Sequence, residues 1–509
     1  MAGNNARIAK NTIFLYGRLV VTMLISLYTT RVVLNVLGVV DFGIYNVVCG
    51  FVAMFAFLNT TMSNGIQRFY NYEAGKNGIE SVTKVYQTAI QIQLLLVLLI
   101  VLVIDPIGIW YINYQMVIPN ERLFAANWIF QFSILSLVFV VIQVPFSAAV
   151  MAHEKMDYYA TIGILDAILK LVIIVILPFL EGDNLIVYGG LILTISIINF
   201  LCYSIYSLKN FKELQLARTY HKDMFKSIFE FSGWNVVEMF AWTMQGQGVN
   251  LIMNLFCGPV ANAAQGVASQ ISSALNSFCS NLSVAFRPQL VHSYAERNYE
   301  RTTNMMFGMS KAMFVMMTMM VTPLVLEMSY VLHIWLGNSI PEYTLQFSVL
   351  LICSLLPRNM TMALSQVVHA SGQMRNYQLG SALVILIVLP LSYIVLKLGY
   401  SPVCIYACNI VIFLLLWFVD LHLLRKVFVF SLRKYFKTVA FPCISTLALS
   451  SVCPYLVHVL LEEGIVRLIC VLLISTINIV IVAYMILLSP KEKQIINNLI
   501  SNKFLKSRI

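Results

Sequence analysis

Residues 29–77 read TTRVVLNVLGVVDFGIYNVVCGFVAMFAFLNTTMSNGIQRFYNYEAGKN, and this stretch predicts two long helices joined by a tight corner. An apolar helix is expected to end at Arg31. The segment GVVDFG at residues 38–43 then supplies glycine and aspartate, which short reversals between helices favour. A second apolar helix is expected over about residues 42–62, followed by a polar, basic exit up to Lys76.

The same plan returns about 220 residues later, at a spacing that suggests a repeat. Gly258-Pro259 predicts a second corner, a helix is expected over residues 263–286, and residues 287–297 form a second basic exit. A further pair of segments has nearly the same offset. VMAHEKMDYY starting at Val150 and VHASGQMRNY starting at Val368 are identical at four of ten positions. Matching segments in matching places of a membrane chain predict an internal duplication.

The composition indicates a polytopic membrane protein. Of the 509 residues, 60% are hydrophobic and 11% are charged, which lies far outside the range of soluble proteins. The apolar runs are about 20 residues long, the length that crosses a bilayer core. The N-terminus has no cleavage site of a signal peptide, so the first apolar segment is expected to be retained. The ten cysteines lack C-x-x-C spacing and are expected to be small apolar side chains rather than disulfides or metal ligands.

Fourteen spans are expected, so that both termini lie on one side of the membrane. The first half of the chain is expected to hold six spans, at about 12–34, 42–63, 83–104, 124–147, 158–178 and 185–207. The second half repeats this number at about 228–256, 263–286, 304–326, 344–367, 378–397 and 402–424, and two more follow at about 438–460 and 465–488. All loops are short, and the longest, residues 105–123, carries Trp110, Tyr111 and Tyr114 as expected interfacial anchors.

Lysine and arginine fall mainly on one side of this topology. Of the 33, 26 lie in the N-terminus, alternate loops and the C-terminal tail, with Lys311 among them. Four, namely Arg31, Arg122, Lys397 and Arg467, lie on the other side, and three lie inside spans. Because positively charged loops stay in the cytoplasm, the rich side and both termini are expected to be cytoplasmic. This topology accounts for the net charge of +11, so we expect no nucleic acid partner.

Ionisable residues inside the spans usually face a cavity or a partner, because they are costly in lipid. The deep set is Arg18, Asp166, Lys170, Glu238, Arg358 and Asp420. Asp166 and Lys170 are four residues apart and can form a purely structural ion pair on one helical face. Arg31 and Arg287 lie near span ends, where a substrate role and snorkelling to the interface remain alternatives. Asp420 is expected to be a solvated boundary residue.

The seventh and eighth expected helices are the least lipid-like. They carry Trp234, Asn235, Glu238, Trp242, Gln245 and Asn276 together with several other amides and serines. Hydrogen bonding between helices is one explanation, and a hydrated lumen that binds sugars is the preferred one. Glu238 and Asp166 are candidates for a coupling ion, a proton or sodium. No Walker A loop, H-E-x-x-H or G-x-S-x-G motif is present, and the seven histidines show no metal spacing. Transport without a cofactor is therefore favoured over catalysis.

Three segments resemble bacterial polysaccharide-export flippases of the multidrug/oligosaccharidyl-lipid/polysaccharide exporter superfamily. They are NTIFLYGRLVVTMLISLYTTRVVLNVLG from Asn11, VVDFGIYNVV with NGIQRFYNYEAGKN, and QFSILSLVFVVIQVPFSAAVMAHEKMDYYA from Gln131. The resemblance implies an all-α integral membrane fold with two six-helix bundles in a V around a central cavity. The expected bundles are residues 1–210 and 211–430, and residues 431–509 add two helices and a basic tail.

The resemblance also implies a substrate, an undecaprenyl-diphosphate-linked oligosaccharide flipped across the bacterial inner membrane by alternating access for lipopolysaccharide, O-antigen or capsule synthesis. Arg18, Arg31, Lys170 and Arg358 suit a diphosphate, because guanidinium groups bind phosphate bidentately. The amides and tryptophans of the polar helices suit sugars. Implied partners are membrane lipids and the polymerase and glycosyltransferases of the pathway. A small-molecule antiporter of the same superfamily, a lipid II flippase, an integral-membrane glycosyltransferase and a non-transporting scaffold remain alternatives.

Overall fold

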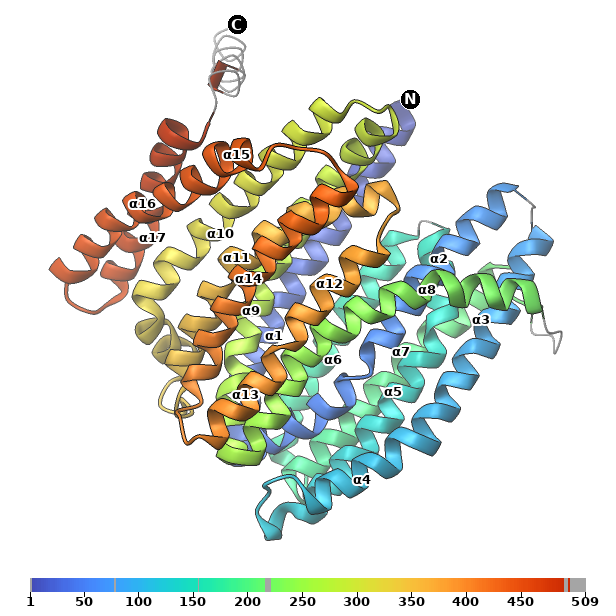
Figure 1. The fold of residues 1–509 in the computed structure, drawn as a ribbon. Coiled ribbons are helices and arrows are strands. Elements are labelled where there is room, and N and C mark those ends of the chain that lie inside the picture. Colours follow the sequence, from blue (N-terminus) through green and yellow to red (C-terminus); the bar gives the residue numbers. More distant parts are fainter. Residues whose placement is uncertain (1, 77–78, 154, 216–220, 489–492, 495–509) are drawn as a thin grey trace, which may run out of the picture. The chain divides into compact units, whose positions relative to one another are not determined.

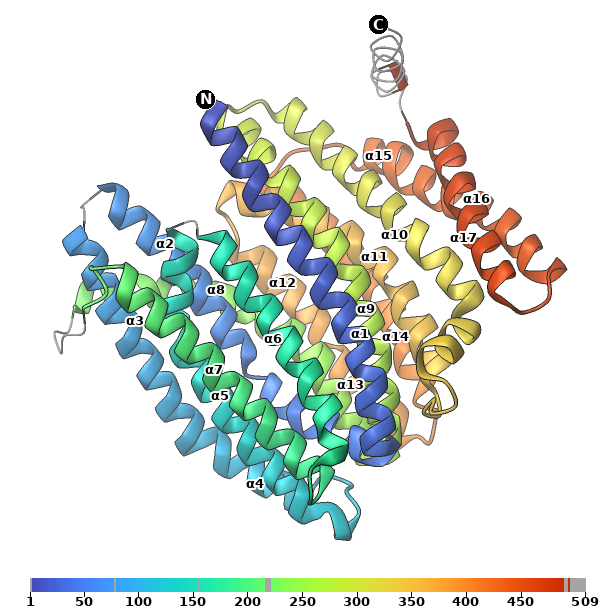
Figure 2. The same cartoon turned by 180° about the vertical axis from the view of Figure 1, so that it is seen from behind.

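The computed structural model describes residues 2–76, 79–153, 155–215, 221–488 and 493–494. This part of the chain is helical, with no strand (Figures 1 and 2). Among these described residues, twelve helical segments are long and apolar enough to cross a membrane. The chain divides into two compact units, and both are discontinuous in sequence. Unit 1 contains residues 1–267, 338–343 and 385–405, and unit 2 contains residues 268–337, 344–384 and 406–509.

Unit 1 holds the N-terminal helices and two short pieces from later in the chain. Its elements are α1 (Ala2–Ala53), α2 (Ala56–Lys76), α3 (Ile79–Leu99), η1 (Ile100–Ile104), α4 (Asp105–Tyr114), η2 (Asn120–Arg122), α5 (Leu123–Ala152), α6 (Met156–Ile176), η3 (Leu177–Phe179), α7 (Asn184–Asn210), α8 (Lys222–Thr243), η4 (Met244–Gly248), the first part of α9 (Val249–Ala295) and α13 (Val388–Lys397). Within this unit α5 packs along α7 and α2, and α1 packs on α6.

Unit 2 holds the rest of α9 and the C-terminal helices. Its elements are α10 (Tyr299–Leu336), α11 (Thr344–Ser371), most of α12 (Arg375–Leu386), most of α14 (Val403–Val427), α15 (Leu432–Tyr435), η5 (Phe436–Ala440), α16 (Phe441–Leu460), α17 (Ile465–Val482) and η6 (Ala483–Leu487). Here α10 packs along α11, and α16 and α17 form a hairpin that packs on α10.

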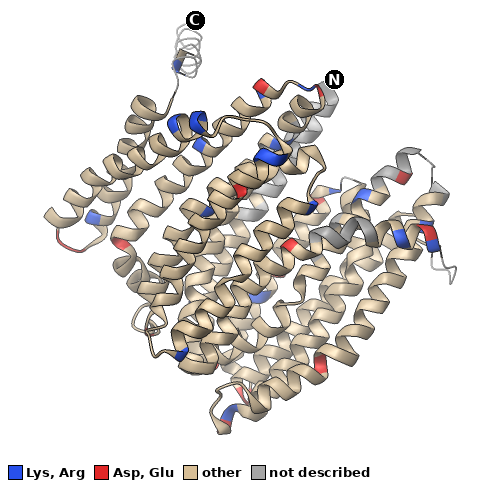
Figure 3. Cartoon of the chain, in the orientation of Figure 1, with Lys and Arg blue, Asp and Glu red and all other residues tan. Residues whose placement is uncertain are grey.

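Figure 3 shows that lysine and arginine lie mostly near helix ends, with few along the helix middles.

The corner expected at residues 38–43 is a single-residue break. Gly38 has φ 78° and ψ 169°, whereas α1 is helical on both sides of it. The expectation that the first helix ends at Arg31 is therefore wrong, because helical geometry continues to the break. Gly258 interrupts α9 in the same way, with φ 70° and ψ −172°. These dihedral angles are accessible only to glycine, since a Cβ atom would clash with the backbone. The two glycines thus give both halves of the chain the same backbone break.

The count of fourteen spans is not confirmed. The twelve spans of the described residues match the expected positions, but two of them, residues 20–53 and 236–280, each run across a backbone break and take the place of two expected spans. These are the two spans that Gly38 and Gly258 interrupt. The polar exit of the first corner is also helical, because α2 continues to Lys76.

Residues 105–114 are helical rather than a long loop. They form α4, which continues α3 through the π-helix η1, so one span covers residues 81–114. Pro106 lies in the first turn of α4, just after η1, and because the helix is continuous there, its missing N–H removes one backbone hydrogen bond beside the π-helical turn. The connection that remains is residues 115–119. Tyr111, expected as an interfacial anchor, stacks on Phe51 with 5.7 Å between ring centroids.

Two charged residues are more buried than the sequence suggested. Asp420 of α14 was expected to be solvated, but it is 3% exposed and accepts a hydrogen bond of 2.5 Å from Ser381 of α12. Lys311 was assigned to a basic loop, but it lies within α10 and is 8% exposed. Lys311 lies inside the expected span 304–326, so only its assignment to a loop was wrong, whereas the error on Asp420 has a physical cause. The sequence places a residue along its own helix but does not say which neighbouring helix covers that face.

Candidate functional site

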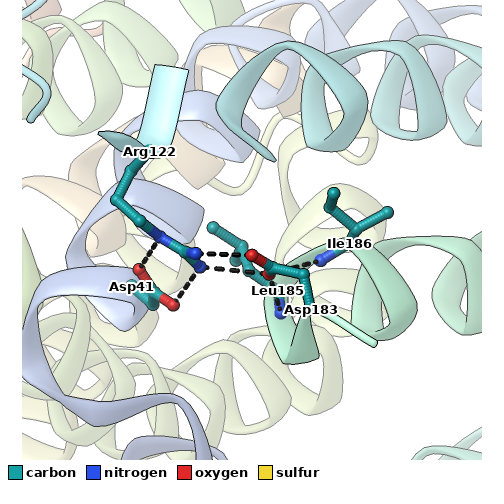
Figure 4. A network of polar contacts seen from close by, with 5 residues as sticks. All are labelled: Asp41, Arg122, Asp183, Leu185 and Ile186. Atoms are coloured by element: carbon teal, nitrogen blue, oxygen red, sulfur yellow. Dashed lines mark hydrogen bonds and ion pairs between the residues drawn. The ribbon is translucent and has the colours of Figure 1, made fainter. Parts of the chain in front are cut away.

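A three-residue ionic network joins three helices of unit 1 (Figure 4). Arg122, at the start of α5, donates from Nε to Oδ1 of Asp41 at 2.8 Å and from Nη2 to the second oxygen of that carboxylate. The same guanidinium donates to Asp183 from Nη1 at 2.5 Å and from Nη2 at 3.1 Å. Asp41 follows the Gly38 break in α1, and Asp183 precedes α7. Arg122 therefore holds the part of α1 that follows the Gly38 break against the starts of α5 and α7.

Asp183 also caps α7. Its Oδ1 accepts from the backbone N–H of Leu185 at 2.9 Å and of Ile186 at 3.4 Å. Burial raises the pKa of Asp183, but the hydrogen bond and charge of Arg122 and the two backbone N–H groups lower it more, so the net pKa falls below its ordinary 3.8. Because the pKa of Asp183 is lower in the folded protein, its carboxylate stabilises the fold at pH values above its ordinary pKa. This stabilisation is lost as the pH falls through the lowered pKa.

Replacing Arg122 by glutamine is expected to lower the free energy of unfolding by about 2 kcal/mol, because two carboxylates then face each other without a cation. The loss of stability is moderate because the Arg122 side chain is 25% exposed, so water screens its charge. Thermal unfolding of the purified protein in detergent measures the loss. Adding Asp41→Asn to this variant is expected to recover part of the stability by removing the carboxylate repulsion. An unchanged melting temperature for Arg122→Gln would rule out a stabilising network.

A ladder of buried asparagines lies in the same unit. Asn262 donates to the side-chain oxygen of Asn250 at 2.7 Å and accepts from Asn254 at 2.8 Å. Asn254 accepts from the backbone N–H of Val117 at 2.9 Å, and Asn250 donates to the backbone carbonyl of Asn46 at 3.3 Å. The ladder therefore ties the first segment of α9 to α1 and to the connection between α4 and α5. Buried amides of this kind need partners, since lipid offers none.

Glycines allow close helix contact beside this ladder. A Cβ atom at Gly43 would overlap the backbone carbonyl of Pro259, and one at Gly266 would lie 2.6 Å from the side chain of Asn46. The residues after the two breaks, Gly38 and Gly258, therefore pack directly on one another. Small residues permit this approach of helix backbones.

Of the predicted site residues, Asp166 and Lys170 form the ion pair that their spacing predicted. Lys170 Nζ lies 2.8 Å from Asp166 Oδ2, and Asn199 of α7 donates to the other oxygen at 2.7 Å. Because each oxygen of Asp166 has a partner, the pair has a structural role between α6 and α7. A role in substrate or ion binding stays a prediction.

The other predicted residues of unit 1 lie on α1, α8 and η4. Arg31 is partly buried in α1, and Glu238, Trp242 and Gln245 are partly buried along α8 and η4. Each of these four side chains has an interaction partner. The side chains of Arg18, Trp234 and Asn235 lie outside the described residues. The polar segment MQGQG forms the π-helix η4, a local widening that often occurs at functional sites.

Two predicted residues and one open case belong to unit 2. Arg358 is partly buried in α11 directly after Pro357, and Asn276 is partly buried in α9. Arg287 donates from Nε to Oε1 of Gln366 in α11 at 2.9 Å. Since Gln366 is 4% exposed, it fixes the guanidinium of an otherwise exposed arginine. Arg287 is therefore held by a hydrogen bond to protein, and the choice between a substrate role and snorkelling stays a prediction.

Sequence reasoning missed a buried carboxylate, Glu327 of α10. It is 0% exposed and contacts His458 and Arg467, which belong to α16 and α17. The expected span ended at residue 326, directly before Glu327, whereas α10 continues to Leu336. The signal was present, because Glu327 is the one charged residue of the apolar segment PLVLEMSYVL at residues 323–332.

The described residues include no group of three or more histidine, cysteine, aspartate or glutamate side chains that could hold a metal ion. A surface hollow of about 510 Å³ lies at the turn between α9 and α10 in unit 2. It is lined by Phe286, Asn298, Glu300, Arg301, Asn304, Met305 and Gly308. None of the predicted site residues lines it.

The sequence model of one protein family, described as polysaccharide biosynthesis protein, matches residues 8–291 of the chain. This match covers more than half of the sequence and includes both glycine breaks. The chain belongs to the polysaccharide biosynthesis protein family. No curated protein matches the chain by sequence.

Solved structures place this polysaccharide biosynthesis protein in a transporter fold. The lipid II flippase MurJ in an inward closed conformation matches with a TM-score of 0.70 at 13% identity, over 94% of this chain and 98% of the flippase. An inward-facing multidrug resistance MATE family transporter of the MOP superfamily has a TM-score of 0.62 at 15% identity, over 82% and 99%. A MOP superfamily transporter from Pyrococcus furiosus has a TM-score of 0.60 at 15% identity, over 82% and 95%.

These matches show that the polysaccharide biosynthesis protein is a multi-pass membrane protein with the fold of MOP superfamily transporters. The match to the lipid II flippase reaches into the C-terminal region. A coverage of 94% is more than residues 1–430 could supply alone, so the likeness to the lipid II flippase includes part of residues 431–509.

Proposed function

We propose that the protein is a flippase that moves undecaprenyl-diphosphate-linked oligosaccharide repeat units across the bacterial inner membrane for polysaccharide synthesis. The observation that carries this proposal is the family match over residues 8–291 in a chain with a transporter fold. The family match supports a role in polysaccharide synthesis, and the transporter fold supports movement of a substrate across the membrane by alternating access.

The embedded cations support an anionic substrate. Arg31 in unit 1 and Arg358 in unit 2 are partly buried within membrane-spanning helices. Arginine offers several donors in a fixed plane and binds phosphate oxygens bidentately. A polyprenyl diphosphate headgroup is the lipid-linked anion that such residues fit. The amides of η4 and of α9 are suited to hydroxyl groups of the attached sugars.

The proposal also includes the topology of the chain, its partners in the pathway and a coupling ion. Basic loops favour a cytoplasmic location of both termini, and the same loops attract the anionic headgroup of a lipid made on that side. The polymerase and glycosyltransferases of the pathway would supply and consume this substrate. The cycle is driven by a proton or a sodium ion in this proposal, and Glu238 and Asp166, two acidic residues inside the spans of unit 1, are its candidate sites.

A lipid II flippase is the second candidate, and the coverage of 94% by the match to such a flippase favours it. Lipid II and the proposed substrate share the polyprenyl diphosphate and differ in the sugar. A multidrug antiporter has less support, because the matched MATE structure covers 82% of this chain.

Deletion of the gene is expected to abolish the surface polysaccharide and to trap its lipid-linked intermediate on the cytoplasmic leaflet, because synthesis continues while export stops. Immunodetection of the glycan and mass spectrometry of extracted lipids measure the two effects, and complementation with the wild-type gene is the control. Accumulation of lipid II in place of the oligosaccharide lipid would identify the second candidate. Unchanged glycan without accumulation of lipid II, together with altered resistance to cationic drugs, would refute both flippase functions.

A further inference from the structure

A buried ionic triad joins the C-terminal hairpin to α10. Nδ1 of His458 lies 2.8 Å from Oε1 of Glu327. Arg467 donates to Oε2 of the same carboxylate from Nε at 3.1 Å and from Nη2 at 3.0 Å. The side chain of Glu327 is 0% exposed and that of Arg467 is 11% exposed. Three helices of unit 2 therefore converge on one carboxylate, and both of its oxygens are satisfied.

The position of the triad makes it a clamp on one end of the hairpin. His458 lies in the last turn of α16 and Arg467 lies in the first turn of α17. A buried carboxylate that loses its cation is left uncompensated, which is strongly unfavourable. The triad therefore favours the docked hairpin, and it stabilises the docked position at the turn between α16 and α17.

The remaining buried face of α17 is short and mostly apolar. Val471, Ser475 and Ile479 follow Arg467 at intervals of four residues and are each 0% exposed. A hydrogen bond of 2.8 Å from Asn478 to the backbone carbonyl of Ser450 connects α17 to α16 rather than to α10. The hairpin is thus tied together internally, so α16 and α17 can move as one body.

The opposite end of the hairpin has a different kind of attachment. Tyr435 of α15 is 0% exposed, and its hydroxyl accepts a hydrogen bond of 3.2 Å from Nε1 of Trp417. Its ring lies 5.4 Å from that of Phe307 and 6.3 Å from that of Phe430. This aromatic cluster directly precedes the π-helix η5, which leads into α16. Apolar contacts of this kind are non-directional and tolerate small rotations, whereas the triad depends on geometry.

We propose that the α16–α17 hairpin is a hinged element, anchored by the aromatic cluster at Tyr435 and held closed on α10 by the Glu327–His458–Arg467 latch. Opening of the latch swings the turn between α16 and α17 away from α10 while η5 absorbs the rotation. Figures 1 and 2 both show the hairpin lying along α10 with α15 at one end. The inference rests on contacts within unit 2 and does not depend on the transported substrate.

Hydrogen–deuterium exchange of the full-length protein in lipid nanodiscs tests the latch. In Glu327→Gln and Arg467→Gln, backbone exchange at the end of α16 and the start of α17 is expected to rise about tenfold or more, since docking there loses its charge pairing. Exchange in residues 432–443 is expected to stay as in the wild type, because the hinge keeps its aromatic contacts. The matched control is Glu463→Gln, since Glu463 is 51% exposed and lies 3.9 Å from Arg467.

The pattern of exchange decides between a latch and a general defect. Wild-type exchange in both latch variants would refute the proposal. Faster exchange throughout the hinge and α5 as well would also refute it, because the triad would then support the whole fold rather than one end of the hairpin. Exchange is measured without a transport assay, so failure of the proposed transport function would leave the result on the latch interpretable.

Discussion

Replacing Gly43 by alanine is expected to prevent accumulation of stable folded protein. A Cβ atom at this position would overlap the backbone carbonyl oxygen of Pro259. A flexible side chain could rotate away, but a backbone atom moves only if α1 or α9 shifts. Such a shift would also strain the hydrogen bond from Asn250 to Asn46 and the ladder beyond it. We expect a loss of about 3 kcal/mol or more in the free energy of unfolding.

The yield of monodisperse protein after detergent extraction and its melting temperature measure this effect. Gly308→Ala is the matched control, because Gly308 lies inside α10 and a Cβ there would meet nothing within 4 Å. Alanine favours a helix over glycine, so the control is expected to be neutral or slightly stabilising. Gly43→Ala protein with wild-type yield and melting temperature would show that the contact between α1 and α9 is not tightly packed.

Replacing Arg358 by alanine is expected to lower glycan export about tenfold or more while the protein level stays normal. Arg358 follows Pro357 in α11, and this proline removes a backbone hydrogen bond to the carbonyl of Cys353. The local bend and the partly buried guanidinium give an anionic headgroup a charged contact within a span. Arg358→Lys is expected to keep part of the activity, because lysine retains the charge but loses the bidentate geometry.

Surface glycan and membrane protein level are measured together in the complemented deletion strain. Arg301→Ala is the control, because this substitution removes the same charge from the chain. The side chain of Arg301 lies at the start of α10 and is 54% exposed. Export at the wild-type level by Arg358→Ala would exclude a role for this cation in substrate binding. A fall in protein level parallel to the fall in export would assign Arg358 a structural role instead.

The membrane-spanning helices could be predicted from the sequence because their signal is local. Runs of apolar residues gave the positions of the spans, and the spacing of Asp166 and Lys170 gave an ion pair that the structure contains. The breaks at Gly38 and Gly258 were also expected, since glycine is required where backbone angles exclude other residues. That each break is only one residue long was not expected, because the helix resumes directly after the glycine where neighbouring helices support it.

The polar networks could not be predicted, because their members are distant in sequence. Arg122 is 81 residues from Asp41 and 61 from Asp183, and Arg467 is 140 residues from Glu327. Each residue alone resembles a loop or span-end charge. Asp420 looked solvated for the same reason, since Ser381 comes from another helix.

The sequence by itself determined that this chain is a helical membrane protein, where its spans lie and where glycine breaks two of them. It also carried the family, because the matching segments are continuous in sequence. Only the tertiary structure decided which charges are paired, which glycines touch a backbone and which helix covers each polar face. The physical reason is that hydropathy and backbone torsion act along the chain, whereas burial and ion pairing depend on which helix faces meet.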